Sequence, residues 1–198
     1  MNKPARTQVP IHELLARRWS PRAFDASRPV SREQLLSMLE AARWAPSCYG
    51  DEPWRFIVWD KNADAASWQR AFDCLVEFNR QWVKNTPVLM LALASKSFRK
   101  GTPNRHGQYD TGAASENICL QATALGLMAH QMGGFDAAKI AQAFGIPDEF
   151  VCMAMIAVGY QAAADVLDGS LKEPELAERA RRPLGESFFL GGWGVPVA

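Results

Sequence analysis

Residues 88–94 read Val-Leu-Met-Leu-Ala-Leu-Ala, an unbroken apolar run that follows Pro87. This run is much shorter than the roughly 20 residues that a helix needs to cross a bilayer. It is therefore predicted to be a buried strand with apolar side chains on both faces. Val151 to Val158 is a second apolar run of similar length and is predicted to be another buried strand.

The remaining elements follow from side-chain periodicity and turn residues. Strands are predicted over 54–59, 87–94, 127–132 and 151–160, and helices over about 11–18, 31–45, 63–83, 110–125 and 137–144. Segments 95–108 and 165–198 show no such period. Because helices and strands are interspersed along the chain, the fold class is predicted to be α+β.

Composition indicates one soluble globular domain spanning residues 1–198. The chain has 48% apolar and 22% charged residues, enough to bury a core, and it contains no repeat or linker. Its formal net charge is +1, which disfavours non-specific binding to nucleic acid or to an anionic membrane surface. The first ten residues do not resemble a secretion signal, so a cytoplasmic location is expected.

The four cysteines are widely and unevenly spaced, at Cys48, Cys74, Cys119 and Cys152. They form no Cys-x-x-Cys pair and have no nearby pair of histidines, so the sequence predicts neither a zinc site nor a disulfide scaffold. We expect reduced thiols and no bound metal.

The end of the chain is apolar without being periodic. Residues 188–194 read Phe-Phe-Leu-Gly-Gly-Trp-Gly. Apolar segments of this kind usually need a neighbour to cover them. Residues 185–198 are therefore predicted to be an arm that two subunits exchange in a homodimer.

Two short segments suggest ligand binding. Arg18-Trp19-Ser20-Pro21-Arg22 places two guanidinium groups and a hydroxyl at a helix end, where they suit a phosphomonoester. The alternative is a solvated basic surface that favours the helix dipole. In Gln131-Met132-Gly133-Gly134, adjacent glycines after a strand let the backbone approach a flat ligand. The alternative there is a tight turn before a helix capped by Asp136.

Together, these segments and several others closely resemble the FMN-dependent nitroreductase family. The matching motifs, in order, are Arg18 to Asp25, Glu40 to Ser47, Pro53 to Phe56, Asp110 to Asn117, Ala124 to Leu127, Gly134 to Asp136, Ile156 to Tyr160 and Arg181 to Leu184. The resemblance spans roughly residues 11–194. It implies an α+β fold with a central, mostly antiparallel sheet flanked by helices, and a homodimer with FMN at the subunit interface.

The resemblance also implies which residues bind FMN. They are Arg18, Trp19, Ser20, Arg22, Pro46, Ser47, Cys48, Gly50, Asn79, Gln131, Met132, Gly133, Gly134, Arg181 and Arg182. Among these, the arginines and Ser20 bind the phosphate, Asn79 reads the pyrimidine edge, and residues 46–50 come from the partner subunit. Residues 131–134 follow the ring, with the backbone of Gly133 and Gly134 near flavin N5. No catalytic side chain is implied, because the cofactor carries the chemistry.

The chain departs from the family pattern at three places. Gly50-Asp51-Glu52 stands where many members have Asn-x-Gln, Gly133 stands where some have glutamate, and Trp82 stands where some have lysine. The first change removes an asparagine that commonly contacts the flavin. The changes at Gly133 and Trp82 are expected to affect how the protein binds the nicotinamide donor and the reduction potential of the flavin.

Several side chains remain as minor candidates. His130 lies in an apolar strand and is interpreted as a hydrogen-bonded core or interface residue rather than as an acid-base catalyst. Cys48 is interpreted as a small packing residue. Trp82, or a residue of segment 95–108, is a candidate to cap the face on which a substrate stacks.

Three hypotheses of function remain open. The first is an oxidoreductase that takes hydride from NADH or NADPH and passes it, in a ping-pong cycle, to a small electron-poor acceptor such as a nitroaromatic or a quinone. The second is a flavin enzyme specialised for one metabolite. The third is a protein that binds FMN without turnover, which the Gly50-Asp51-Glu52 departure motivates.

Overall fold

Four strands form one sheet in the order β1-β2-β4-β3, and each neighbouring pair is antiparallel. The computed structural model describes residues 3–198. The strands are β1 (Trp54–Asp60), β2 (Val88–Ser95), β3 (Met128–Met132) and β4 (Phe150–Gly159). Each lies within one residue of its predicted bounds, and the predicted α+β class is confirmed. The sheet is wholly antiparallel in the described residues, where the resemblance implied a mostly antiparallel one.

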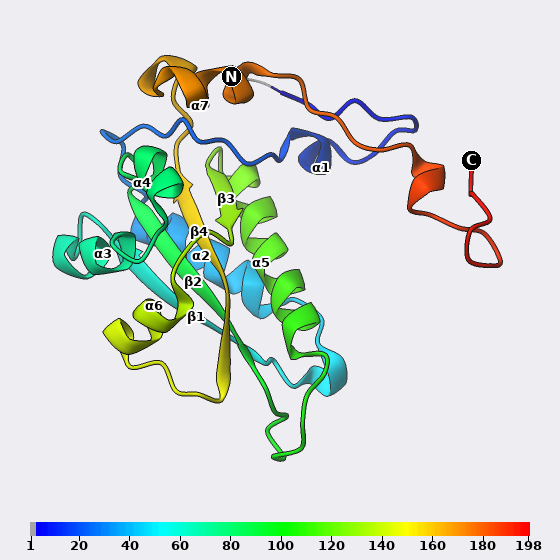
Figure 1. The fold of residues 1–198 in the computed structure, drawn as a ribbon, viewed down its shortest axis with the longest axis horizontal. Helices are drawn as coiled ribbons and strands as arrows, with labels where there is room; N and C mark the ends of the chain where they lie inside the picture. Colours follow the sequence, from blue (N-terminus) through cyan, green and yellow to red (C-terminus); the bar gives the residue numbers. More distant parts are fainter. Residues whose placement is uncertain (1–2) are drawn as a thin grey trace.

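The central strand β2 is covered on both faces. Leu89, Leu91 and Leu93 belong to one buried cluster, whereas Val88, Met90 and Ala92 belong to the other. This alternation is the period of two expected for a strand buried on both sides. Figure 1 shows α3, α4 and α6 on one side of the sheet and α5 on the other.

The helices begin and end at the expected local signals. They include α1 (Glu13–Arg17), α2 (Arg32–Arg43), α5 (Gly107–Ala124) and α6 (Ala137–Phe144). Ser31 and Gln34 form a reciprocal capping box at the start of α2. The Asp136 side chain accepts from the Lys139 N–H at the start of α6. Gly126 follows α5 with a φ of 75°, which a glycine adopts without strain.

The single helix predicted over residues 63–83 is wrong. The structure has two helices there, α3 (Ala65–Phe72) and α4 (Glu77–Val83). The segment between them pairs with the chain after β3: Asp136 N–H donates to Cys74 O at 2.8 Å, and Val76 N–H donates to Gly134 O at 3.1 Å. These distant contacts break the helix without any local proline or glycine, which explains why periodicity did not reveal the break.

Two other predicted boundaries need correction. The helix predicted from Asp110 begins three residues earlier, at Gly107. In the final segment, which was predicted to lack periodic structure, residues Gly169–Leu176 form helix α7. Short 3-10 turns occur at Cys48–Gly50, Ala164–Val166 and Leu184–Glu186.

Residues 179–184 run beside the N-terminal segment, and the last residues extend beyond it, away from the sheet (Figure 1). They are held mainly to one another, since Leu190 N–H donates to Val195 O at 2.9 Å and Val197 N–H donates to Phe188 O at 3.0 Å. Trp193 is 92% exposed. None of the helices within residues 3–198 has the length and apolar character needed to span a membrane.

Candidate cofactor-binding site

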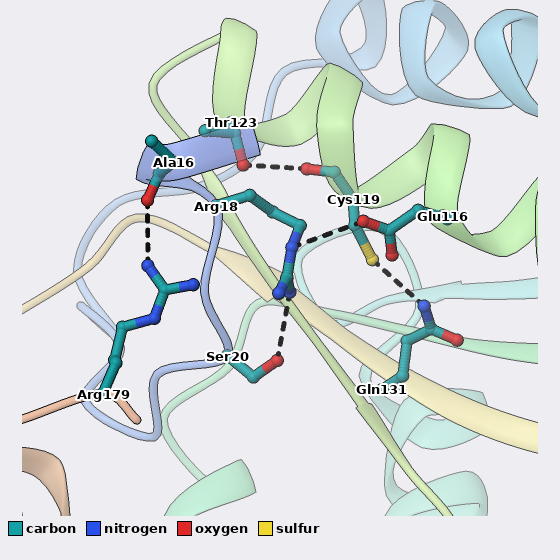
Figure 2. Close-up of polar contacts among 8 residues, drawn as sticks. All are labelled: Ala16, Arg18, Ser20, Glu116, Cys119, Thr123, Gln131 and Arg179. Carbon is teal, nitrogen blue, oxygen red and sulfur yellow. Dashed lines mark hydrogen bonds and ion pairs between the residues drawn. The ribbon is translucent and has the colours of Figure 1, made fainter. Parts of the chain in front are cut away.

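The loop after α1 brings Arg18 and Ser20 together beside α5 (Figure 2). Arg18 closes α1, because its backbone N–H donates to Leu14 O at 3.1 Å. Its Nη1 lies 3.5 Å from Ser20 Oγ, and its Nε lies 3.3 Å from Glu116 Oε1. Burial raises the pKa of Glu116, and the Arg18 charge opposes that rise. The ion pair with α5 therefore holds the guanidinium next to the hydroxyl.

The side chain of Gln131 on β3 lies on the same side of α5 (Figure 2). Its Nε2 donates to Cys119 Sγ at 3.3 Å. Burial raises the pKa of Cys119 to about 11, so this thiol stays protonated at neutral pH. The contact fixes the amide of Gln131 near Arg18 and Ser20 (Figure 2).

His130 ties β3 to the same loop. Its Nδ1 lies 2.9 Å from Pro21 O. The pKa of His130 is lowered to about 4, mainly by burial; the bond to Pro21 opposes this shift, and the positive charges of Arg22 and Arg18 add to it. The ring is therefore neutral near pH 7, and Nδ1 carries the proton that it donates to Pro21. This agrees with its interpretation as a hydrogen-bonded core residue.

We expect His130 to make the protein less stable in acid. Its folded pKa of about 4 lies below the ordinary value of 6.5, so the unfolded chain binds the proton first as the pH falls. Stability is then lost between pH 6.5 and 4, by up to about 3 kcal/mol. The variant His130→Asn, which keeps a donor near Pro21, is expected to lose less stability over this range in urea unfolding measurements. His12→Asn, on an exposed residue, is the control, and equal losses in both variants would contradict the assignment.

Trp82 does not cap a substrate face, so that prediction is wrong. Its side chain is completely buried, with its ring 4.6 Å from that of His130 and 6.1 Å from that of Phe24. Trp19 and Met132 are buried as well, and the Trp19 Nε1 has no hydrogen-bond partner in residues 3–198.

Asn79 and Gly134 are directly bonded. Asn79 is buried, and its Nδ2 donates to Gly134 O at 2.9 Å. A Cβ at residue 134 would lie 2.6 Å from that Nδ2 and 2.9 Å from Val76 Cγ2, so only glycine fits there. A Cβ at Gly133 would have no neighbour within 4 Å, so the backbone is open at that position. The structure thus joins two of the predicted flavin contacts, on α4 and after β3.

Arg22 has an unsatisfied donor in this region. Its Nε is buried and has no hydrogen-bond partner in residues 3–198, and its guanidinium carbon lies 5.7 Å from the ring of Phe78 on α4. A buried donor normally has a partner. An anionic ligand would supply one.

The arginines of the late segment lie beside the N-terminal segment and α1. Arg179 Nη1 donates to Lys3 O at 2.8 Å and to Ala16 O at 2.9 Å, and Figure 2 shows the second bond. Burial lowers the pKa of Arg179, and the charges of Arg18 and Arg181 lower it further. Arg181 and Arg182 are exposed and line a groove of about 430 Å³ between residues 5–15 and 179–184. These positive charges repel one another, so an anion between them would be favoured.

The Pro46–Gly50 segment does not join this cluster within one chain. It forms a turn at the N-terminal end of α5, where Cys48 N–H donates to Asp110 Oδ2 at 3.0 Å. Tyr49 and Gly50 there have φ values of 56° and 64°. Arg18 and Gln131 instead contact α5 at Glu116 and Cys119, roughly two turns or more further along the helix. Within one chain the predicted site residues therefore do not form a single cluster: the Pro46–Gly50 turn lies apart, and the groove lined by Arg181 and Arg182 does not include Arg18, Ser20 or Arg22.

Sequence reasoning missed three residues of the site: Glu116, Arg179 and Glu175. Arg179 belongs to an Arg-Ala-Arg-Arg run whose charge was a usable signal. Glu116 lies inside a quoted family motif, but nothing local indicates its pairing with Arg18. Glu175 is 1% exposed and bonds to the backbone of the Arg22 loop, more than 150 residues away in sequence.

The residues present fit FMN. The phosphate suits the guanidinium groups of Arg18 and Arg22 and the hydroxyl of Ser20, with an unsatisfied buried donor at Arg22. The ring suits the strand end at Gln131 and the open backbone at Gly133, next to the glycine-only position at 134.

Known proteins are similar to this chain in both sequence and fold. A solved structure described as an oxidoreductase containing FMN is 35% identical, with a TM-score of 0.90 over 96% of each chain. An uncharacterized 15.4 kDa protein of Mycolicibacterium smegmatis is 36% identical over 62% of this chain and 82% of its own length. The major NAD(P)H-flavin oxidoreductase of Aliivibrio fischeri is 33% identical over 46% of this chain and 42% of its own. Residues 15–160 match the nitroreductase family, and the chain belongs to that family.

Proposed function

We propose that this member of the nitroreductase family, an oxidoreductase, is a homodimeric FMN enzyme that uses NADH or NADPH to reduce small electron-poor acceptors such as nitroaromatics or quinones. The observation that carries the proposal is the convergence of Arg18, Ser20 and Gln131 beside α5 (Figure 2). The chain that follows Gln131 leads to Gly134, whose carbonyl accepts from Asn79. The FMN of the similar solved structure and the NAD(P)H-flavin activity named for the Aliivibrio fischeri relative support it.

The basic residues bind the cofactor in this proposal. Arg18, Ser20 and Arg22 bind the phosphate, and Arg181 and Arg182 add positive charge from the late segment. Bound FMN supplies hydride transfer in a ping-pong cycle, from the nicotinamide to the ring and then from the ring to the acceptor. The repulsion among the arginines makes an empty site costly, which favours binding of a phosphate with a charge near −2.

The residues after β3 orient the ring. The Asn79 Nδ2 donates to Gly134 O, so its Oδ1 would be the atom that accepts a hydrogen bond from the pyrimidine edge. The open backbone at Gly133 and the adjacent Gly134 would bring N–H groups to the ring near N5. A backbone donor there stabilises negative charge on the ring without a titratable side chain.

The Pro46–Gly50 turn acts from the partner subunit. Pro46, Ser47, Cys48 and Gly50 line the partner's flavin, which accounts for their distance from Arg18 in one chain. Residues 185–198 pack on the partner subunit as an exchanged arm. The chain forms a single domain, 1–198, and its first two residues lie outside the described part. We place this enzyme in the cytoplasm.

An absorbance spectrum tests the proposal. The purified protein is expected to show a flavin spectrum that bleaches on anaerobic addition of NADH or NADPH and recovers with a quinone. Bleaching with one nucleotide alone would identify the donor. A protein that holds FMN but does not bleach would support the alternative of a non-catalytic FMN-binding protein. A colourless protein that also refuses added FMN would overturn the cofactor assignment.

Substrate range separates the two enzyme hypotheses. Similar turnover of several nitroaromatics and quinones is expected for the proposed reductase. Turnover confined to one metabolite would favour the specialised flavin enzyme.

A further inference from the structure

A buried carboxylate holds the loop that carries Arg22. Glu175, near the end of α7, is 1% exposed. Arg22 N–H donates to both of its carboxylate oxygens, at 3.1 and 2.9 Å, and Ala23 N–H donates to Oε1 at 3.1 Å. Both oxygens of Glu175 therefore accept from the backbone of the Arg22 loop.

The same residue connects the loop to the N-terminal segment. Lys3 Nζ donates to the backbone carbonyl of Glu175 at 2.6 Å, and Arg179 donates to Lys3 O at 2.8 Å. The end of α7, the N-terminal segment and the loop therefore meet at Glu175. Helix α7 has no other buried polar residue, and its Leu171 packs into the core.

We propose that Glu175 is a positioning residue for the cofactor phosphate: its carboxylate fixes the adjacent N–H groups of Arg22 and Ala23 and so directs the Arg22 guanidinium toward the ligand. This inference rests on the proposed FMN function. The Arg22 Nε is buried without a partner, so the side chain it directs is ready to bind an anion. Glu175 itself does not touch the ligand.

The sign of the effect distinguishes positioning from simple charge. Glu175 is negative and lies near a site for a negative phosphate, so its charge alone disfavours FMN. Glu175→Gln removes that charge and would strengthen FMN binding if charge were its whole effect. If Glu175 is a positioning residue, the amide of Glu175→Gln places an NH₂ donor against the Arg22 N–H donor, and the loop is released. Weaker binding is therefore the expected result.

The experiment measures FMN affinity and the phosphate environment in the full-length protein. In Glu175→Gln, the FMN dissociation constant is expected to rise about tenfold, which corresponds to about 1.4 kcal/mol. The ³¹P resonance of bound FMN is expected to shift, which a general loss of stability would not cause. At saturating FMN the kcat should match that of the wild type. Glu173→Gln, which removes an equal charge from an exposed position of α7, should change none of these readouts.

Amide protection separates this inference from the proposed function. In the FMN-free wild type, the Arg22 and Ala23 amides should exchange slowly, and in Glu175→Gln they should exchange faster. If the wild type bound no FMN, the proposed function would be refuted. Protection of the Arg22 and Ala23 amides would still show whether Glu175 holds the loop. Unchanged or tighter FMN binding in Glu175→Gln, with an unshifted ³¹P resonance, would overturn the positioning role.

Discussion

Replacing Arg22 and Arg182 together with alanine is expected to empty the flavin site. Arg22 has a buried guanidinium nitrogen without a partner, and Arg182 is exposed on the groove beside the N-terminal segment. Each charge-assisted contact with a phosphate contributes about 1.5–3 kcal/mol, so losing both should raise the FMN dissociation constant by about two to four orders of magnitude. Flavin content after purification and a fluorescence titration with FMN measure the effect.

The matched control removes two arginines outside the site. Arg32 and Arg105 are exposed and lie away from the α1 loop and the late segment, so their double alanine variant changes the net charge equally. It should retain its flavin. Full occupancy in the Arg22/Arg182 variant would contradict the phosphate assignment. Arg22→Lys should bind FMN with intermediate affinity, since an ammonium keeps the charge but not the planar fork of donors.

Deleting residues 185–198 is expected to weaken the homodimer. Phe188, Leu190 and Trp193 are 58%, 69% and 92% exposed in the single chain. Covering three large apolar side chains is worth several kcal/mol before the cost of association. We therefore expect the dimer dissociation constant to rise at least about a hundredfold. Sedimentation velocity over a range of protein concentrations measures this change.

A substitution variant separates the apolar side chains from the chain length. Changing Phe188, Leu190 and Trp193 to serine should weaken the dimer much as the deletion does. Glu186→Gln together with Ser187→Ala, in the same segment, should leave it intact. The melting temperature of the subunit core should change little, because the arm extends away from the sheet (Figure 1). An unchanged sedimentation profile for the deletion would refute the exchanged arm.

The regular elements were predictable because their signals are local. The apolar run at 88–94 predicted the central strand, since a strand buried on both faces needs apolar side chains at every position. Ser31 and Gln34 predicted the start of α2, because a capping box is closed within four residues. The ordered family motifs likewise indicated which short segments carry the cofactor contacts.

The break between α3 and α4 was not predictable in this way. Residues 73–76 are compatible with a helix, and they leave it because Cys74 and Val76 bond to the chain around Gly134. That break matters for the site. Because of it, α4 begins at Glu77, and Asn79 in its first turn donates to the Gly134 carbonyl. Trp82 illustrates the same limit: an aromatic residue near a predicted site was interpreted as a surface cap, and packing against Phe24 and His130 buries it.

The sequence by itself determined the four strands, the start of α2, the basic segment Arg18 to Arg22 and the glycine pair after β3, because side-chain periods and hydrogen bonds over a few residues specify them. Only the tertiary structure decided that Glu116 pairs with Arg18 and that Glu175 holds the Arg22 loop. Those contacts join groups about 100 and 150 residues apart, and their partners are chosen by how the helices pack on the sheet rather than by any local propensity.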